Sequence, residues 1–383
     1  MDKKNKQQKA SWLLRILGGK WQFLTIPLLS ILFSLIAISI VVLLIGKNPL
    51  TTVTSLLQGS GWLPKATYAA HKNMFTDFTE FLDAMTPMLF ASLAVIVAFK
   101  AGLFNIGVSG QMLLAGFMAT IFIGYSSLPS ALAWPLVILV GVVMGAIVGG
   151  FTGFLKHRFN INEVVTSIML NYIIQYVVSF FINTRYVDAV SRQSRAINPD
   201  ARLTIVNFEA NDLRFRIPLC FGVAILAAFL IYLLFSKSRQ GYEIKAVGLN
   251  PKAAKYAGIS VGRNILLGMT LSGALAGLAG VTYYLGYYNT IQPNTLASMG
   301  FDSIAVALLG NSHPLGAIFA STLIVTLTKG STYMSSIVGV RQEISSLIIG
   351  MILLFSACRA YIKYKVDLKL STSHAKRSER GKV

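Results

Sequence analysis

A chain of 383 residues, 54% hydrophobic and only 13% charged, is too apolar for an ordinary globular domain. The composition predicts a polytopic membrane protein. The net charge of +20 does not call for a nucleic-acid partner, because Lys and Arg collect at the ends of apolar segments, where they set orientation in a bilayer. The two cysteines show no CxxC motif and no His/Cys spacing of a zinc site, so no metal is expected.

The basic segment 1–23 is predicted to be a cytoplasmic tail, followed by an uncleaved first span, because the next apolar run is too long for a signal peptide. We expect an all-α bundle of about ten transmembrane segments over 24–360, with interrupted helices, and a basic cytoplasmic tail over 361–383. The apolar runs lie at 24–45, 85–99, 106–125, 133–155, 163–182, 218–235, 264–285, 303–312, 314–328 and 344–360. Three of them, 85–99, 303–312 and 314–328, are shorter than the ~20 residues of a straight span, so they should be tilted, broken or re-entrant.

Ten crossings divide the connecting segments between two sides of the membrane. Most of the 34 Lys and Arg then fall on the side that holds both termini. By the positive-inside rule, both termini are predicted to be cytoplasmic in a multi-pass protein of the cell membrane.

A polar interruption at 100–116 is the first candidate for a binding site. Asn105, Ser109 and Gln111 stand there between apolar runs, and an unpaired amide in hydrocarbon is costly. Such a break is typical of a carrier's cavity, with Phe104 as an apolar wall, although a cytoplasmic turn is the alternative. Asn171, alone in an apolar span, is either a further ligand group or a hydrogen bond between helices.

The outer loop 184–217 is rich in arginine and contains no lysine. A planar guanidinium pairs well with carboxylates, which favours docking of an acidic protein partner. A solvated loop with local charge pairs is the alternative. The arginines assigned to docking are Arg185, Arg192, Arg195 and Arg202.

Small and aromatic residues predict further features of the bundle. Glycines recur at every fourth position over 141–153, and further glycines follow at 273, 277 and 280, which predicts close helix packing. Four tyrosines over 283–288 indicate an interfacial belt or, alternatively, an outer gate. A second interruption at 309–316 resembles in placement the one at 100–116, so an inverted repeat is expected. Asp302 is predicted to cap a helix beginning at Ser303, with a ligand role as the alternative.

The segment 236–263 is predicted to be a cytoplasmic loop carrying a short helix. Asn250 is a good N-cap, Pro251 suits the first helical position and Gly258 suits the stop, so the helix should cover 251–257. Two turns are unstable alone. With Ala253 and Ala254 on its surface, the helix should pack in a groove of a soluble partner or, alternatively, lie on membrane lipid.

Within this loop, GLNPKAAKYAGI, followed by LSGALAGLAG, resembles the coupling loop of permease subunits in ATP-binding-cassette (ABC) importers of the ribose and branched-chain amino-acid type. Three further stretches resemble the branch that takes up nucleosides: GLFNIGVSGQM at 102–112, INEVVTSIMLNYI at 161–173 and GFDSIAVALLGNSHPLG at 300–316. The resemblance covers about residues 85–360.

The resemblance implies a cytoplasmic ABC ATPase, a second permease subunit, expected to be a different chain, and an extracellular substrate-binding protein. The chain itself has no GxxxxGK[ST], so ATP and Mg²⁺ should be bound by the ATPase and no cofactor by this chain. A nucleoside is neutral and needs amides and hydroxyls beside an aromatic or apolar wall. Ribose, another sugar or an amino acid is the nearest alternative substrate.

Two other classes fit the sequence less well. An ion-coupled secondary transporter would place charges deep in its bundle, whereas Glu163 and Asp302 lie near segment ends. A membrane enzyme would need a catalytic constellation, but the four histidines are scattered and have no paired carboxylates beside them. No catalytic residue is therefore predicted.

Overall fold

The computed structural model describes residues 36, 39–40, 42–210, 212–339, 341 and 343–357. The two predicted tails, 1–23 and 361–383, and most of the first predicted span lie outside the described residues. The described part is mostly helical, as predicted. Its helices are α3 (Pro49–Gly59), α4 (Met74–Lys100), α5 (Val108–Ala119), α6 (Ser130–Phe159), α7 (Glu163–Phe181), α8 (Phe221–Lys237), α9 (Arg239–Leu249), α10 (Pro251–Tyr256), α11 (Val261–Thr282), α12 (Met299–Leu309), α13 (Pro314–Val338) and α14 (Glu343–Ala357).

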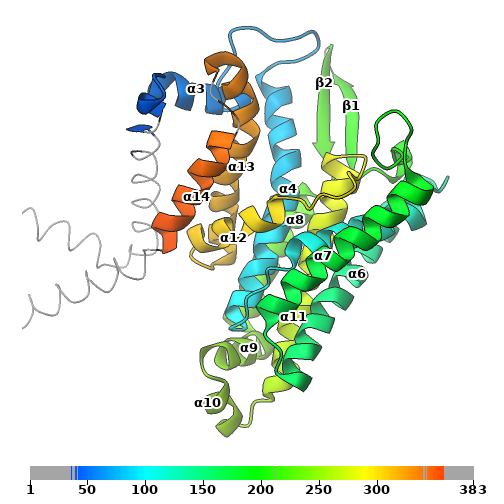
Figure 1. Cartoon of the computed structure of the whole chain (residues 1–383), viewed down its shortest axis with the longest axis vertical. Helices are drawn as coiled ribbons and strands as arrows, with labels where there is room; N and C mark the ends of the chain where they lie inside the picture. Colours follow the sequence, from blue (N-terminus) through cyan, green and yellow to red (C-terminus); the bar gives the residue numbers. More distant parts are fainter. Residues whose placement is uncertain are drawn as a thin grey trace, which may run out of the picture.

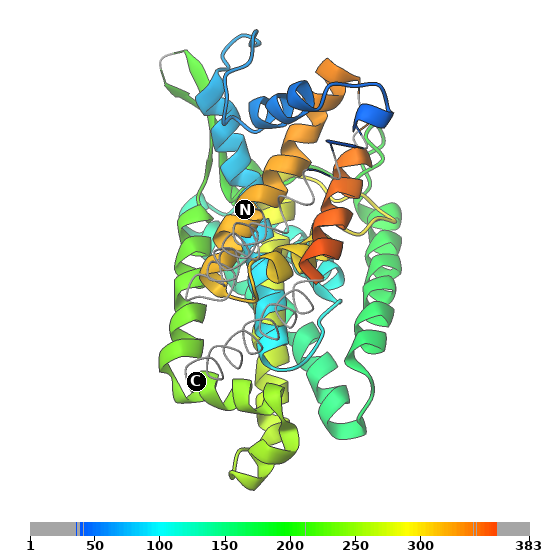
Figure 2. The same ribbon diagram turned by 90° about the vertical axis from the view of Figure 1, so that its left-hand side faces the viewer.

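Five of the described helices are long and apolar enough to cross a membrane, or six spans if α8 and α9, bent by 75° at their junction, count as one. Short π-helical turns follow α5, α7 and α11, the last of them at Tyr283–Tyr287. In Figures 1 and 2 α9 and α10 lie at the lower end of the molecule, and α3 and a β-hairpin lie at the upper end.

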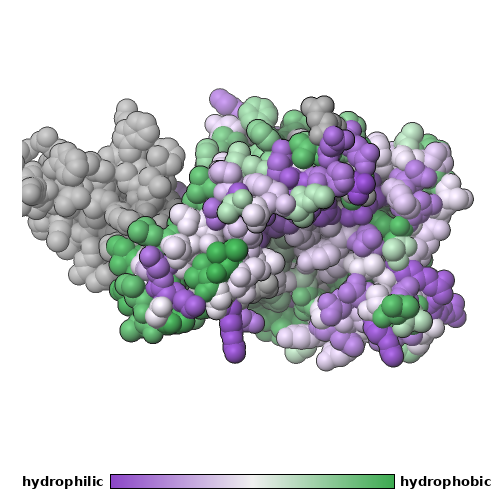
Figure 3. Space-filling view, turned by 90° about the horizontal axis from the view of Figure 1, so that it is seen from above, coloured by the Kyte–Doolittle hydropathy of each residue, from purple (hydrophilic) through white to green (hydrophobic). Residues whose placement is uncertain are grey.

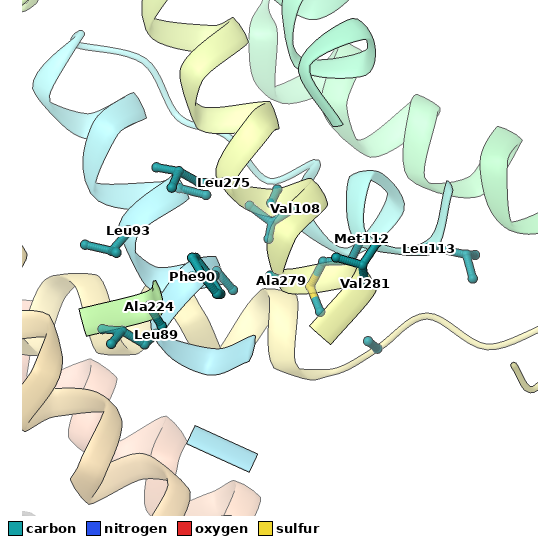
Figure 4. Close-up of a cluster of buried hydrophobic side chains, with 14 of the residues drawn as sticks. Leu89, Phe90, Leu93, Val108, Met112, Leu113, Ala224, Leu275, Ala279 and Val281 are labelled. Atoms are coloured by element: carbon teal, nitrogen blue, oxygen red, sulfur yellow. The ribbon is translucent and has the colours of Figure 1, made fainter. Parts of the chain in front are cut away.

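Helix α4 is the centre of the fold, and 94% of its apolar segment is buried inside the protein. It contacts α11, α12, α13, α8 and the hairpin, whereas α6 and α7 leave most of their surface uncovered. Asn73 and Thr76 form a reciprocal capping box at its start. Figure 4 shows Leu89, Phe90 and Leu93 of α4 beside residues of α5, α8 and α11.

Two of the three spans predicted to be short are full-length helices, so that expectation was wrong for them. Helix α4 has 27 residues and α13 has 25, while α12, with 11, is short as predicted. The hydropathy pattern missed the upper ends of α4 and α13 because they carry charges, and those charges pair with each other: Lys329 Nζ lies 2.8 Å from Glu80 Oε2. Two polar helix ends that face one another can both stay in the bundle.

The glycine repeats lie at a close helix contact, as predicted, and the structure shows that this contact joins α6 to α11. A Cβ placed on Gly145 would lie 2.7 Å from Gly277 Cα, and one on Gly149 would lie 2.7 Å from Gly273 Cα. Such distances leave no room for any side chain, because the two backbones are in contact there.

The described part is not entirely helical, which corrects the all-α prediction. Strands β1 (Thr204–Ala210) and β2 (Leu213–Pro218) form an antiparallel hairpin with a bulge between Ile205 and Phe208. Alternating apolar residues and the Asn-Asp turn are a strand signal that the membrane pattern obscured. Asp212 takes the left-handed conformation of that turn, at φ 61°.

Candidate functional site

The polar interruption at 100–116 folds into a loop between α4 and α5 and the first turns of α5. Asn105 Nδ2 donates to Gln111 Oε1 at 3.0 Å and to Ser272 Oγ at 2.9 Å, and its Oδ1 accepts from the Gly107 amide at 3.0 Å. Ser272 in turn donates to the Ala94 carbonyl at 2.7 Å. Asn105 and Gln111 are each only 1% exposed. These groups therefore join the loop, α5, α11 and α4 into one buried network.

Two further predicted ligand groups extend this network to other elements. Asn171 of α7 accepts from the Gly110 amide at 2.9 Å and donates to the Ile106 carbonyl at 3.0 Å. Ser109 donates to the carbonyl of Ala297, just before α12, at 3.0 Å. Phe104, half-buried, packs against Phe99 with ring centroids 5.2 Å apart. The structure thus brings all five predicted residues into one region, where the four polar ones have partners inside the protein.

A polar hollow lies elsewhere, between the upper parts of α3, α4 and α13 and the start of α12. Its volume is about 450 Å³, within the range of about 300–1,000 Å³ typical of small-molecule sites. Tyr283, Tyr287 and Tyr288 contribute an aromatic wall. Hydroxyl groups of Ser298, Thr328, Thr332 and Ser336 also line it. Figure 3 shows this end from above, with hydrophilic side chains spread across its middle.

Ion pairs tie the walls of this cavity together. Lys65 Nζ lies 2.6 Å from Asp77 Oδ2, and Glu80 receives Lys72 at 3.1 Å and Lys329 at 2.8 Å. The pairs join α4 to the α3–α4 connection and to α13. The sequence predicted no chemistry for these residues, although the charges of Glu80 and Lys329 within apolar helices were an available signal.

Asp302, the sixth charged residue of the cavity wall, is not the cap that the sequence predicted. Helix α12 begins at Met299, so the carboxylate stands within its first turn, where it caps no backbone amide. It lines the cavity and forms no hydrogen bond or ion pair through its side chain with any residue that the structure describes.

The four tyrosines form one aromatic cluster. The rings of Tyr283 and Tyr288 have centroids 5.0 Å apart, and those of Tyr287 and Tyr288 lie 4.8 Å apart. Tyr283 and Tyr288 also line a second hollow of about 250 Å³, together with Gln193, Gln292 and Thr290 among others. The cluster therefore contributes to the walls of two polar hollows.

The outer arginines fall into two groups. Arg185, Arg192 and Arg195 are exposed and form no ion pair with other described residues. Arg202 is half-buried and donates to the Gly286 carbonyl at 3.3 Å. With Arg214 and Arg216 it lines a basic hollow of about 450 Å³ beside the hairpin. Burial and the neighbouring Arg216 lower the pKa of Arg202, as expected of a guanidinium with too few anionic partners.

The hairpin is fixed to the bundle by a buried carboxylate. Asp83 of α4 accepts from Thr204 Oγ1 at 2.7 Å and pairs with Arg216 at 3.2 Å. Arg216 also donates to the carbonyl of Tyr287 at 2.9 Å. The base of the hairpin is thereby linked to the tyrosine cluster.

At the lower end, α10 has the predicted cap, first residue and stop. Asn250 Oδ1 accepts from the amides of Lys252 and Ala253 at 3.0 and 3.1 Å, Pro251 is the first helical residue, and Gly258 has φ 78°. Ala253 is exposed, but Ala254 is buried, which corrects the expectation that both lie on the surface. The short helix packs on α9, so one of two adjacent alanines must face inward.

Helices α9 and α10 expose two large apolar side chains. Leu249 is 88% exposed and Tyr256 is 95% exposed. Large apolar groups left open to this extent beside Ala253 mark an interaction surface. No cluster of three potential metal ligands occurs among the residues that the structure describes.

Residues 78–357 match the family model described as branched-chain amino acid transport system / permease component. The chain is 33% identical to the nucleoside ABC transporter permease protein NupB of Lactococcus lactis subsp. cremoris, over 95% of this chain and all of that protein. It is 34% identical to the guanosine ABC transporter permease protein NupP of Bacillus subtilis, over 89% of this chain and 95% of that one. Identity to the glucose ABC transporter permease protein TsgB13 of Haloferax volcanii is 28%, over 76% and 78% of the two chains.

Proposed function

The chain belongs to the family described as branched-chain amino acid transport system / permease component, and we propose that it is the membrane permease of an ABC importer that carries nucleosides. The observation that carries this proposal is the likeness, at 33–34% identity over about nine-tenths of the chain or more, to permeases named for nucleosides and for guanosine. Purine nucleosides are the preferred substrates under this proposal. Glucose or another sugar is the second candidate, because a glucose permease is also similar, at lower identity and coverage.

The complete bundle is proposed to contain about ten membrane segments arranged as an inverted repeat. Five or six spans are found among the described residues by length and composition, and the short helices α5 and α12 would enter the membrane only in part. The contact between these two short helices supports the repeat. There the hydroxyl of Ser109 in α5 donates a hydrogen bond to the carbonyl of Ala297, just before α12. Both termini and α10 would then face the cytoplasm.

The face formed by Leu249, Ala253 and Tyr256 is proposed to dock a cytoplasmic ATPase, which would bind ATP and Mg²⁺. Asn250, Pro251 and Gly258 hold the short helix that presents this face, and Ala254 anchors it to the bundle. Nucleotide-driven closure of the ATPase would reach the membrane helices through α9, which packs against α8 and α11.

On the opposite side, an extracellular binding protein is proposed to deliver the substrate. Arg185, Arg192 and Arg195 offer exposed guanidinium groups, and Arg202 adds to the basic hollow beside the hairpin. Carboxylates of a partner would satisfy them. A second permease subunit, expected to be a different chain, would complete the translocation path within the lipid bilayer.

Phe104, Asn105, Ser109, Gln111 and Asn171 stay proposed as the substrate-binding group of the interruption. Because the four polar residues are buried and bonded to one another or to nearby segments, they would contribute to substrate binding by positioning the start of α5. Direct contact would require one of these bonds to open during transport.

Reconstitution tests the proposed function. The permease, its ATPase, its binding protein and any second permease are placed in vesicles, and uptake of labelled nucleosides, ribose, glucose and leucine is followed with and without ATP. Accumulation of nucleosides only with ATP is expected. Accumulation by this chain alone and without ATP would contradict the proposal, and preference for glucose would favour the second candidate.

The docking surface has a separate test. Ala253→Glu places a charge on the exposed apolar face, so it should lower ATPase co-purification and uptake at least tenfold while membrane insertion is unchanged. Ala189→Glu, the same change on an exposed alanine of the outer loop, is the matched control for co-purification. Normal uptake by the Ala253→Glu protein would exclude this face from docking.

A further inference from the structure

The cavity beneath α3 contains one carboxylate whose partner is not supplied by the described residues. Five of the six charged side chains that line it are engaged in ion pairs, with distances of 2.6–3.1 Å. Asp302 is the sixth. A partly buried carboxylate loses solvation and gains nothing in return unless a donor reaches it, so such a group at a cavity wall indicates a ligand contact.

The charges of the cavity suit a neutral solute. Three lysines and three carboxylates line it, counting Asp302, so the walls have no formal net charge. The three lysines are already paired, so an anionic solute would have to break an ion pair to reach a cation, whereas neutral hydrogen-bond donors can reach Asp302 without breaking one.

The aromatic wall suits a flat ring. Tyr283 and Tyr288 line the same cavity as Asp302, and Tyr288 is 47% exposed, so its ring is available to stack. Flat aromatic walls with a few directed polar groups are the usual construction of sites for heterocycles.

We propose that Asp302 accepts a pair of hydrogen bonds from a nucleoside that lies against Tyr283 and Tyr288 in this cavity. The proposal rests on the proposed function and names the place where the substrate is held. The paired donors are either the adjacent ring N–H and amino group of a guanine-type base or the two ribose hydroxyls. Both present two donors at the spacing of a carboxylate's oxygens.

Uptake by the reconstituted importer tests the role of Asp302. Asp302→Asn keeps the size of the side chain but removes the charge, so guanosine uptake at saturating binding protein should fall about tenfold. Asp212→Asn is the matched control, because Asp212 lies exposed on the hairpin turn, outside the cavity. Guanosine uptake by Asp302→Asn equal to that of Asp212→Asn would overturn the proposal.

The two sources of donors are separated by the choice of solute. If the base is held, wild type carries 2′,3′-dideoxyguanosine, and Asp302→Asn impairs guanosine but not adenosine, which lacks the adjacent N–H pair. If the ribose is held, dideoxyguanosine is carried poorly and adenosine depends on Asp302 as guanosine does. If the wild-type importer carried sugar but no nucleoside, the proposed function itself would be refuted. If it carried nucleosides and the Asp302→Asn variant did so equally well, only the role of Asp302 would be refuted.

Photolabelling of the wild-type protein tests the site without any substitution, so its result does not depend on whether a variant folds. With 8-azidoguanosine, cross-links are expected in the peptides that hold 283–288 and 298–302. Labelling confined to 104–111 would overturn the proposal and place the solute at the interruption instead.

Discussion

Two polar regions of the bundle differ in how their hydrogen-bonding groups are used. At the interruption before α5, Asn105, Gln111 and Asn171 are almost fully buried and bond to each other, to Ser272 or to backbone. In the cavity beneath α3, five charged groups are engaged in ion pairs, but Asp302 lines the cavity without a partner among the described residues. On our proposal, a polar residue in an apolar helix marks a ligand when its hydrogen-bonding capacity is left unused by the protein.

The largest expected effect tests the buried region. Asn105→Leu would remove four hydrogen bonds and leave the buried amide of Gln111 and the Gly107 backbone amide without these partners, while Ser272 would lose the donor to its hydroxyl. At about 1–3 kcal/mol for each such group, the loss of stability should be several kcal/mol. Most of the protein should therefore be absent from the membrane, as measured by the amount of folded permease after detergent extraction.

Asn105→Ala is a second variant, which distinguishes a role of Asn105 in positioning α5 from direct contact with the substrate. If Asn105 only positions α5, the folded fraction falls and the surviving protein keeps its half-saturating nucleoside concentration. A raised half-saturating concentration at a normal folded fraction would instead place the substrate at the interruption and remove the contrast between the two regions.

Much of the framework was predictable from the sequence because it depends on local chemistry. Asn250, Pro251 and Gly258 define α10 by capping and backbone conformation, and the glycine repeats define the contact of α6 with α11. The motif at 102–112 identified a polar break, but whether its amides face a cavity or each other depends on Ser272 and Asn171, far away in the chain.

The cavity could not be read from hydropathy. Its walls include the charged ends of α4 and α13, which the hydropathy pattern assigned to loops, and the ion pair between them joins Glu80 to Lys329, 249 positions apart. The sequence predicts that α12 begins at Ser303 and therefore favours a cap at Asp302, whereas the helix begins four residues earlier, at Met299. An error of one turn was enough to change the environment of the carboxylate.

A smaller effect is expected from breaking the paired charges of the cavity. Glu80→Gln leaves Lys72 and Lys329 without their shared partner, at a cost of about 1–2 kcal/mol, since the side chains are partly solvated. The unfolding midpoint of the purified permease should fall accordingly. Adding Lys329→Met should recover part of the loss, because the unpaired ammonium is then removed. No recovery in the double variant would show that the pair does not act as a unit.

The smallest expected effect on stability is that of Asp302→Asn, and it separates the two regions most clearly. Because the carboxylate has no partner among the described residues, its neutral isostere breaks no described bond and relieves the cost of partial burial. The change in unfolding free energy should be below about 0.5 kcal/mol or slightly stabilising, in contrast to the several kcal/mol lost with Asn105→Leu. A residue kept at no gain in stability, and whose removal impairs uptake, is retained for the solute. If Asp302→Asn lowered the unfolding midpoint as much as Glu80→Gln does, the carboxylate would have a structural partner after all, and the cavity would be another satisfied network like the one before α5.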